Sequence, residues 1–581
     1  MSAVRTHLAI VAIVVAACLG GSLGLGGCAH PAPAGPLPPL PRTVYARYLE
    51  GKLAAYEGNW DAAADALAEA AAAAPDQAMV TVELARVQMK AKRTEAALTT
   101  LAAARKRWPD HPEVWLVSGD LLAHRDPAFA SRAYLRAIRL APDNERAYLG
   151  LVKLQNDDAA ETTLRILIAH VPASVDGHYR LALRLAMRGE LASSTKELRA
   201  VLERDPDHLD ARLDLARALR RQGHLDQAIA ETRSAFDRSG QAVDIAEELF
   251  WLLCEADDRA AAIDLLTLVD DDHSDADALA VIARLDRGLG RIADARVIAQ
   301  RITLLDHDAG MIALAEIQLA VADRAAMRAT LAAIDADSRF AQDAHRLAAT
   351  AALTAGEPAA ALAALATRAT GQDARARPPE PSGLHAPSGS LDHALIAAFA
   401  LADLGKLAEA RAALAPFATG AEADPADHPA VVLARARLAE RAGDPAAALA
   451  LLEPLIRAKP DLVAALNLAG YLLADTHQRL GDAERYLRHA RELAPGDPEI
   501  LDSWGWLLLR RGDARAAVRA LDRAARFAPL EPDILVHLAA AWAADGAPRT
   551  AAATLDRASA LVPTPAVQKR IMAMRQTLPA R

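Results

Sequence analysis

The sequence has little cysteine, few aromatic residues and no surplus of positive charge. Its 581 residues include three cysteines, Cys18, Cys28 and Cys254, and no Cys-x-x-Cys pair. This excludes a fold held together by disulfides and a zinc site built from cysteines. Lys and Arg number 66 against 75 Asp and Glu, mixed along the chain, for a net charge of −9. Without a basic stripe, nucleic-acid binding is disfavoured.

Alanine takes the place of the missing aromatic bulk. Hydrophobic residues make up 52% of the chain, but aromatic residues make up only 4%. Because an alanine side chain buries little surface, a core rich in alanine needs closely spaced backbones. Ala, Leu, Arg and Glu favour helices, and runs of β-branched residues are scarce. The composition therefore predicts an all-α protein.

The first 28 residues have the order of a secretory signal. One basic residue, Arg5, precedes an apolar stretch from Leu8 to about Leu19, and small residues follow. The end of this segment, Leu25-Gly26-Gly27-Cys28, resembles the lipobox of bacterial lipoproteins, in which the cysteine is acylated and the chain is cleaved before it. The resemblance implies a signal peptide over residues 1–27 and a lipidated Cys28.

An uncleaved membrane-anchoring helix and an ordinary cleaved signal are the alternatives to lipidation. The apolar stretch is short, and the glycines at 20, 21, 24, 26 and 27 that follow it make a poor membrane-spanning helix. The residue after the cysteine is Ala29 rather than aspartate. By resemblance to enteric lipoprotein sorting, this favours the outer membrane over the inner one. We expect a periplasm-facing protein that is held by lipid in the bacterial outer membrane.

Residues 28–41 form a proline-rich tether in this interpretation. The stretch from Pro31 to Pro41 reads PAPAGPLPPLP and cannot form a helix, because successive prolines lack amide donors and clash with the preceding turn. A polyproline spacer of this length would extend roughly 35 Å at about 3.1 Å per residue. Such a spacer holds a folded body away from a membrane.

Prolines then recur at a near-constant spacing towards both ends of the remaining chain. Successive members of the two series are 30 to 35 residues apart. The series consist of Pro75, Pro109, Pro142, Pro172 and Pro206, and of Pro460, Pro495, Pro529 and Pro563. A period near 34 residues is the signature of an array of helical hairpins.

Each repeat carries more than its proline. The residues at fixed offsets before Pro529 are Gly505, Gly512, Ala517, Leu521 and Ala524, and those before Pro75 are Gly51, Gly58, Ala63, Leu67 and Ala70. The first glycine lets two helices approach closely. The second suits the left-handed position that ends the first helix. The leucine fills the core, and the alanines keep the hairpin tight.

This pattern resembles the tetratricopeptide repeat (TPR) family over almost all of residues 42–564. The resemblance implies an all-α superhelical solenoid of about fifteen antiparallel helical hairpins, although some repeats in the middle are degenerate. A Pro-, Gly- and Ser-rich stretch, residues 371–390, either divides two arrays, 42–370 and 391–564, or forms a long loop in one continuous solenoid. Residues 565–581 are expected to form a capping helix over the last hairpin.

Candidate chemistry is sparse. The chain after residue 27 lacks the Walker A, GxSxG and HExxH motifs. An acidic cluster from Asp270 to Asp277 lacks the glycine and the glutamate of a calcium loop and is interpreted as a turn between repeats. Cys254 follows three apolar residues and is interpreted as a buried core thiol. We expect no catalytic residue, no metal, no cofactor and no enzyme activity.

The last repeats carry the candidate binding residues. First helices line the concave face of such solenoids, which directs one set of polar and aromatic side chains into a groove and assigns Trp504 and Trp542 to the core. Trp506 is the candidate anchor of a peptide-binding hot spot, and packing of the superhelix is its alternative role. The candidate groove residues are Asn467, Tyr471, Asp475, Asp502, Trp506 and Arg510.

Residues 464–563 carry a closer resemblance. The pairs Gly470-Tyr471, Asp502-Ser503, Gly505-Trp506 and His537-Leu538 are similar to the C-terminal region of long proteobacterial TPR lipoproteins. One such protein is an outer-membrane adaptor for a periplasmic carboxyl-terminal processing protease. Trp504, Ala539 and the insert at 371–390 depart from that pattern. The resemblance implies a protease of this class as the partner.

Two functions are compatible with these features. The first is a non-catalytic, membrane-tethered adaptor that brings periplasmic proteins or peptides together on its repeat surfaces. The alternative is a structural scaffold lipoprotein of an envelope complex for polysaccharide export, pilus assembly or outer-membrane protein assembly. The Lys/Asn pattern of carboxylate-clamp TPR proteins is absent, so recognition of a free C-terminal carboxylate is not expected.

Overall fold

A computed structural model describes residues 41–272, 275–335, 337–366, 391–417 and 428–578. Within these ranges the regular structure is α-helical, apart from one short 3-10 helix, η1 (Ala415–Phe417). This confirms the predicted all-α fold class. The predicted signal peptide at 1–27, nearly all of the tether at 28–41 and the dividing stretch at 371–390 lie outside the described residues.

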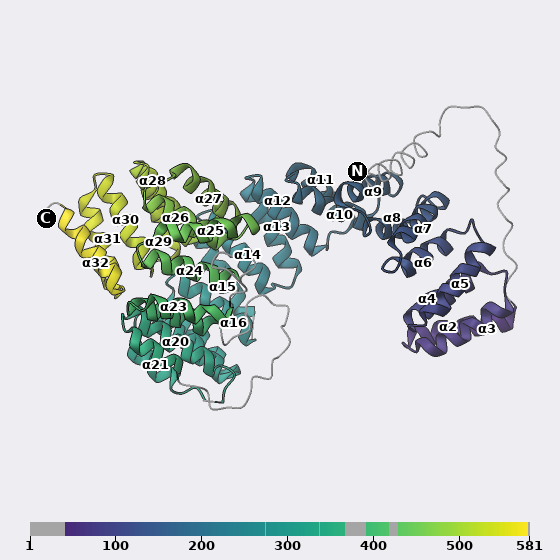
Figure 1. The fold of residues 1–581 in the computed structure, drawn as a ribbon, viewed down its shortest axis with the longest axis horizontal. Helices are drawn as coiled ribbons and strands as arrows, with labels where there is room; N and C mark the ends of the chain where they lie inside the picture. Colours follow the sequence, from purple (N-terminus) through teal and green to yellow (C-terminus); the bar gives the residue numbers. More distant parts are fainter. Residues whose placement is uncertain (1–40, 273–274, 336, 367–390, 418–427, 579–581) are drawn as a thin grey trace. The chain divides into compact units, whose positions relative to one another are not determined.

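The chain divides into two compact units, residues 1–222 (unit 1) and 223–581 (unit 2). The helices of unit 1 follow one another as antiparallel neighbours (Figure 1). They are α2 (Arg42–Tyr56), α3 (Trp60–Ala73), α4 (Ala78–Lys90), α5 (Thr94–Arg107), α6 (Pro112–Leu122), α7 (Pro127–Leu140), α8 (Glu145–Val152), α9 (Asp157–His170), α10 (Val175–Met187), α11 (Leu191–Arg204) and α12 (Leu209–Arg221).

Unit 2 contains the remaining helices. They are α13 (Leu225–Arg238), α14 (Val243–Glu255), α15 (Arg259–Asp272), α16 (Ala276–Gly288), α17 (Ile292–Leu305), α18 (His307–Ala320), α19 (Arg324–Leu331), α20 (Ala341–Thr354), α21 (Pro358–Ala366), α22 (Leu391–Asp403), α23 (Leu407–Leu414), α24 (Pro429–Arg441), α25 (Pro445–Ala458), α26 (Val463–Asp475), α27 (Leu480–Leu493), α28 (Pro498–Arg510), α29 (Ala514–Phe527), α30 (Pro532–Ala544), α31 (Pro548–Ala560) and α32 (Pro565–Thr577).

The repeat residues have the structural roles that their types suggest. A Cβ atom on Gly505 would lie 2.5 Å from Cγ of Leu521, so α28 and α29 approach more closely than a larger residue would allow. Gly512 ends α28 with a φ of +89°, a conformation that glycine adopts without strain. Ala517 and Leu521 are completely buried. The offsets read from the sequence therefore record the contacts of one hairpin.

Helix pairs persist where the repeat pattern is degenerate. Within the described ranges, packed pairs run from α2–α3 to α10–α11 in unit 1 and from α14–α15 to α30–α31 in unit 2, which makes fourteen pairs, close to the expected number of about fifteen. In the weak regions around 143–172 and 309–337, one helix of each pair is short, with eight residues in α8 and in α19. The boundary between the two units falls between α12 and α13.

The last helix, α32, packs against α30 and α31. Its residues Val567 and Ile571 are 3% and 0% exposed and join the apolar core of the last hairpin. Lys569 and Arg570 are exposed on the same helix, and so is Met572. The helix thus covers the apolar face that the last repeat would otherwise present to water.

Unit 2 contains contacts between residues that are far apart in sequence. The guanidinium of Arg523 in α29 donates hydrogen bonds to the backbone carbonyls of Cys254, at 2.7 Å, and Glu255. Arg526 forms an ion pair with Asp257 at 2.9 Å, and Nε of Arg259 donates to the carbonyl of Arg526 at 3.3 Å. We call this set the closing contact, because it joins the turn between α14 and α15 to α29.

The remaining sequence candidates have structural roles. Cys254 is completely buried, and burial raises the pKa of its thiol to about 12, which confirms the core interpretation. In the acidic cluster, Asp270 pairs with Arg301 and Asp275 caps α16 by accepting from the Ala278 amide at 2.8 Å. Both carboxylates therefore have partners within the protein.

Candidate functional site

The predicted binding residues gather on the first helices of the last repeats. Trp506 of α28 lies at their centre and is partly exposed. Its indole Nε1 donates to Oδ1 of Asp475 at 3.2 Å, and its ring stacks on His537 of α30 with centroids 4.5 Å apart. Arg510 lies 6.0 Å from the centre of the same indole. We call these side chains, together with Asn467 and Tyr471 of α26, the C-terminal cluster.

Asp502 does not face outward as a binding residue would. Its exposed fraction is 9%, and that of His537 is 5%. Nδ1 of His537 lies 2.9 Å from each carboxylate oxygen of Asp502. The carboxylate therefore fixes the orientation of the imidazole, on which the Trp506 ring rests. Asp502 therefore lies where it can position the cluster through His537.

Some polar groups of α26 and α28 have hydrogen-bond partners within the protein and others do not. Arg510 donates to the carbonyls of Ala474, at 3.3 Å, and Asp475, at 3.1 Å. Burial raises the pKa of Tyr471, and the nearby Asp475 carboxylate adds to this, so its hydroxyl stays neutral. Oδ1 of Asn467 is buried and has no hydrogen-bond partner among the described residues. This acceptor therefore receives no hydrogen bond from the described part of the protein.

Two members of this surface were not among the candidate groove residues, although the repeat period points to them. His537 lies 35 residues after Asp502, which itself lies 35 residues after Asn467. Likewise Glu440 of α24 lies 35 residues before Asp475. Burial raises the pKa of Glu440, and Asp475 raises it further while Arg437 opposes the shift. Extending each offset by one more repeat would have found both residues.

The two tryptophans assigned to the core lie at its edge instead. Trp504 is partly exposed, and the guanidinium of Arg491 lies over its ring, 4.5 Å from the centroid. Trp542 is also partly exposed beside the last core cluster. An indole is too large for the narrow space between alanine-rich helices, so only part of each ring is buried.

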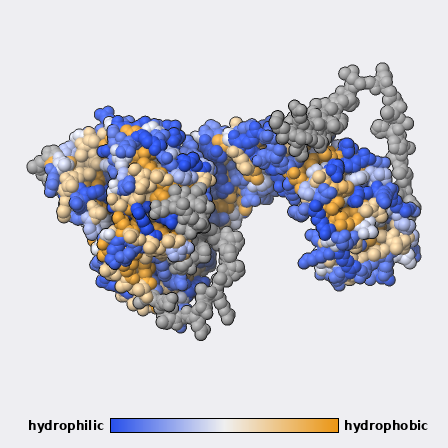
Figure 2. Space-filling view, viewed as in Figure 1, coloured by the Kyte–Doolittle hydropathy of each residue, from blue (hydrophilic) through white to orange (hydrophobic). Residues whose placement is uncertain are grey.

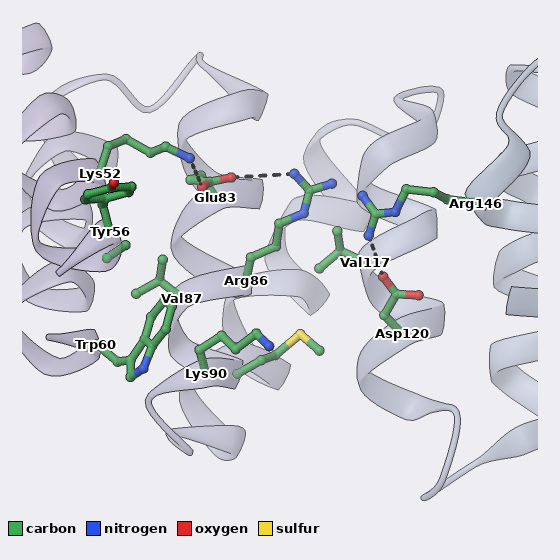
Figure 3. A pocket seen from close by; sticks show the side chains of 12 residues that line it. Lys52, Tyr56, Trp60, Glu83, Arg86, Val87, Lys90, Val117, Asp120 and Arg146 are labelled. Carbon is green, nitrogen blue, oxygen red and sulfur yellow. Dashed lines mark hydrogen bonds and ion pairs between the residues drawn. The ribbon is translucent and has the colours of Figure 1, made fainter. Parts of the chain in front are cut away.

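A pocket of about 540 Å³ in unit 1 was not predicted. It opens on the first helices α2, α4, α6 and α8 and on the start of α3 (Figure 3). Hydrophobic surface over α6–α8 is bordered by hydrophilic surface on the face shown in Figure 2. The pocket is lined by Lys52, Ala55, Tyr56, Trp60, Glu83, Arg86, Val87, Met89, Lys90, Val117, Asp120 and Arg146.

Two aromatic side chains signal this pocket in the sequence. Tyr56 ends α2 and is 90% exposed, and Trp60 begins α3 and is 36% exposed. They flank Gly58, whose φ of +78° makes the turn between the helices. A tyrosine and a tryptophan around a repeat turn are unusual in a chain this poor in aromatic residues, and that contrast was the available signal.

The described ranges contain neither a group of side chains arranged as a metal site nor a helix suited to span a membrane. There, no three His, Cys, Asp or Glu side chains come together as a metal site would require. None of the helices in those ranges combines the length and the apolar character needed to cross a bilayer.

Comparison with protein families identifies the repeats. Two tetratricopeptide-repeat models match, one at residues 54–120 and 185–243 and the other at 433–498 and 503–564. A curated relative, the TPR repeat-containing protein PA4667 of Pseudomonas aeruginosa, is 42% identical over 87 residues. That alignment spans only 15% of this chain and 15% of the relative.

Solved structures resemble parts of the chain. MamA from Desulfovibrio magneticus RS-1 is 17% identical with a TM-score of 0.25 and covers 28% of this chain and 94% of its own. YrrB, described as a TPR protein with an unusual peptide-binding site, is 18% identical with a TM-score of 0.26, covering 30% and 93%. PilW, described as a type IV pilus biogenesis factor, is 17% identical with a TM-score of 0.27, covering 34% and 93%.

TM-scores this low give no information about the binding partners of this chain. The assignment instead follows from the matched repeat models, together with helix pairs whose glycine, alanine and leucine contacts recur at the repeat period. Residues 54–120, 185–243, 433–498 and 503–564 of this chain are thus similar to tetratricopeptide repeats, a fold that serves protein–protein interaction.

Proposed function

We propose that the chain is a non-catalytic adaptor of the bacterial envelope, which binds proteins or peptides on its repeat helices while lipid at Cys28 tethers it to the outer membrane. The observation that carries the binding role is the C-terminal cluster. A partly exposed tryptophan is held there by stacking on His537 and by a hydrogen bond to Asp475. Such an anchored aromatic residue is typical of a binding hot spot.

The geometry favours tight binding because little freedom remains to be lost. Asp502 fixes His537, His537 supports the Trp506 ring, and Arg510 is held by two backbone carbonyls. A partner therefore meets side chains that are already ordered, which lowers the entropy cost of association. The free acceptor of Asn467 adds a specific hydrogen-bond site for a backbone or side-chain donor.

The tether supplies the second half of the proposal. A lipid anchor at Cys28 and a proline-rich spacer confine the chain to a thin layer near the membrane, which raises the effective concentration of whatever it binds. A periplasmic carboxyl-terminal processing protease and its substrates are the partners that the Gly470-Tyr471 and Gly505-Trp506 pairs suggest. The adaptor would bring enzyme and substrate together without chemistry of its own.

A structural scaffold in an envelope assembly is the second candidate. The observation that favours it is the closing contact of unit 2, which ties α14–α15 to α29 and stiffens the body between them. A scaffold needs such stiffness, and its partners would be an outer-membrane barrel or a pore component rather than a soluble protease.

Affinity capture from detergent-solubilised envelope separates the two candidates. The full chain and its Trp506→Ala variant serve as paired baits, with Trp504→Ala as the matched control. We expect a soluble protease that only the unmodified bait and the Trp504→Ala bait retain. Equal recovery of a pore or pilus component by all three baits would favour the scaffold and remove support from the C-terminal cluster.

Membrane tethering is tested separately by Cys28→Ser. Cell fractionation should find the unmodified chain with outer membranes and the variant in a soluble fraction. If the variant stays with membranes, the lipid anchor is wrong, whatever the capture experiment shows.

A further inference from the structure

The pocket of unit 1 combines cations with an apolar wall. Tyr56 and Trp60 lie on one side of it and Arg146 and Asp120 on the other, with α4 between them (Figure 3). The floor is apolar, since Val87 is 3% exposed and Val117 is completely buried. A volume of about 540 Å³ lies in the usual range of ligand pockets. Its open wall suits a short segment of chain.

The lining carries more positive than negative charge. Its cations are Lys52, Arg86, Lys90 and Arg146, and its carboxylates are Glu83 and Asp120. Glu83 is already paired with Lys52, at 2.5 Å, and with Arg86, at 3.5 Å. Asp120 accepts from the Tyr134 hydroxyl at 2.9 Å and pairs with Arg146 at 3.4 Å. Both carboxylates therefore already have hydrogen-bond or ion-pair partners within the protein.

Unused donor capacity remains in the same wall. Lys90 is exposed and has no ion-pair partner among the described residues. Nε of Arg86 is buried and lacks a hydrogen-bond acceptor in that part of the chain, although the outer nitrogens of this guanidinium pair with Glu83 and Glu113. The pocket thus offers cationic donors beside two exposed aromatic rings.

We propose that this pocket is a second binding site, which takes an acidic peptide segment of a partner protein with an apolar side chain among its carboxylates. The apolar side chain lies against Trp60 and Tyr56 over the floor of Val87 and Val117. The carboxylates on either side of it meet Lys90 and the donors of Arg86 and Arg146. This inference rests on the proposed function in one respect, because the pocket would be a second binding surface of the adaptor.

Charge complementarity selects this occupant over a nucleic acid. The cations do not form a continuous stripe, because Glu83 and Asp120 stand between them and would repel a run of phosphates. A peptide can place its carboxylates selectively and put an apolar residue in the space between them. Because Lys52, Lys90 and Arg146 are exposed, added salt should weaken the interaction.

Fluorescence anisotropy with defined peptides tests the proposal on the full chain, kept in mild detergent. The probe is a fluorescein-labelled dodecapeptide with one central phenylalanine flanked by glutamates. Two matched peptides carry glutamine or lysine in place of every glutamate, and a labelled single-stranded oligonucleotide represents the nucleic-acid alternative. We expect the acidic peptide to bind at least about tenfold more tightly than either matched peptide.

Two substitutions locate the site. Trp60→Ala should weaken binding of the acidic peptide about tenfold, as loss of a hot-spot aromatic does, and Lys90→Glu should weaken it by a similar factor. Lys196→Glu is the matched control, since it makes the same charge change on the exposed face of α11 in unit 1. Circular dichroism of each variant verifies that the helices remain folded.

The outcomes distinguish this site from the C-terminal cluster. Trp506→Ala should leave binding of the acidic peptide unchanged, so failure of the capture experiment does not affect this result. Equal affinity for the three peptides, preference for the oligonucleotide, or equal effects of Lys90→Glu and Lys196→Glu would each overturn the proposal.

Discussion

Units 1 and 2 are built from the same hairpin, but their contacts reach over different distances. In unit 1 the well-packed helix pairs are neighbours or next neighbours, such as α4 with α5 and with α6. In unit 2 the closing contact joins residues 267 to 269 positions apart. A repeat array therefore need not be stabilised by nearest neighbours alone, although that is the usual expectation for a solenoid.

The two candidate binding surfaces also differ in how firmly their side chains are held by their neighbours. In the C-terminal cluster of unit 2, Asp502, His537, Trp506 and Asp475 hold one another in place. In the pocket of unit 1, Tyr56 and Lys90 extend into solvent without such support. The comparison suggests one ordered surface for a specific partner and one adaptable surface for a class of acidic segments.

The largest expected effect is the loss of stability that follows from a cavity in the core, together with the range of helices over which that loss is seen. Leu521→Ala and Leu67→Ala each remove a completely buried side chain at the same repeat position and should cost about 2–5 kcal/mol locally. Hydrogen exchange should show lost protection in α2–α4 for Leu67→Ala. For Leu521→Ala the loss should extend to α14–α15, because α29 contacts that turn. If each variant lost protection only in the helices next to its substitution, the proposed difference between the contacts of the two units would be contradicted.

Binding at the C-terminal cluster gives the next prediction. Trp506→Ala should weaken binding of the captured partner by at least about 2 kcal/mol, measured by calorimetry with the purified partner. Trp504→Ala removes an indole from the same helix but leaves the stack on His537 intact, so its affinity should stay near that of the unmodified chain. If both variants bind equally, the cluster is not the site.

The closing contact is tested by Arg523→Met, which keeps the apolar stem and removes the charged donor. Loss of its hydrogen bonds to the Cys254 and Glu255 carbonyls should reduce the local stability of α14–α15 by about 1.5 kcal/mol. Arg519→Met, an exposed position on the same helix, serves as control. No change in exchange at α14–α15 for Arg523→Met would show that the contact is not stabilising.

The smallest effect is a pH dependence confined to unit 2. Burial raises the pKa of Asp286 to about 6, and Arg291 opposes the shift. A raised carboxyl pKa means that the folded state holds a proton that the unfolded state releases. Stability should therefore fall as the pH rises from roughly 4 to 6.

Asp286→Asn provides the control for that prediction. The amide cannot titrate, so the exchange rates of α16, corrected for their intrinsic pH dependence, should become independent of pH over this range. A pH dependence that survives in the variant would assign the effect to another group.

The hairpins could be predicted from sequence because their contacts are local. Gly505, Leu521 and Pro529 lie within one repeat, so one period records how closely its two helices pack. The closing contact depends on small rotations that add up over many repeats, and no single offset encodes that sum. The contact between Arg523 and Cys254 therefore could not be read from the sequence.

The candidate surfaces were partly predictable for the same reason. Trp506 was found because its offset from Gly505 fixes which side of α28 it occupies, and Asp475, the last residue of α26, was found from the corresponding offset after Gly470. The burial of Asp502 was missed, since it depends on His537 in the next repeat. The pocket of unit 1 requires side chains from α2, α3, α4, α6 and α8 together, and it becomes visible only when those helices are placed.

The most direct test of the adaptor is site-specific photo-crosslinking in living cells. A photoreactive phenylalanine analogue replaces Asn467, whose unpaired oxygen lies in the C-terminal cluster, and in a second strain it replaces Arg485, which is exposed on the second helix α27. The account predicts one discrete protein adduct from position 467 and none from position 485. An adduct from position 485 alone would contradict it, because the partner would then bind the opposite side of the hairpin.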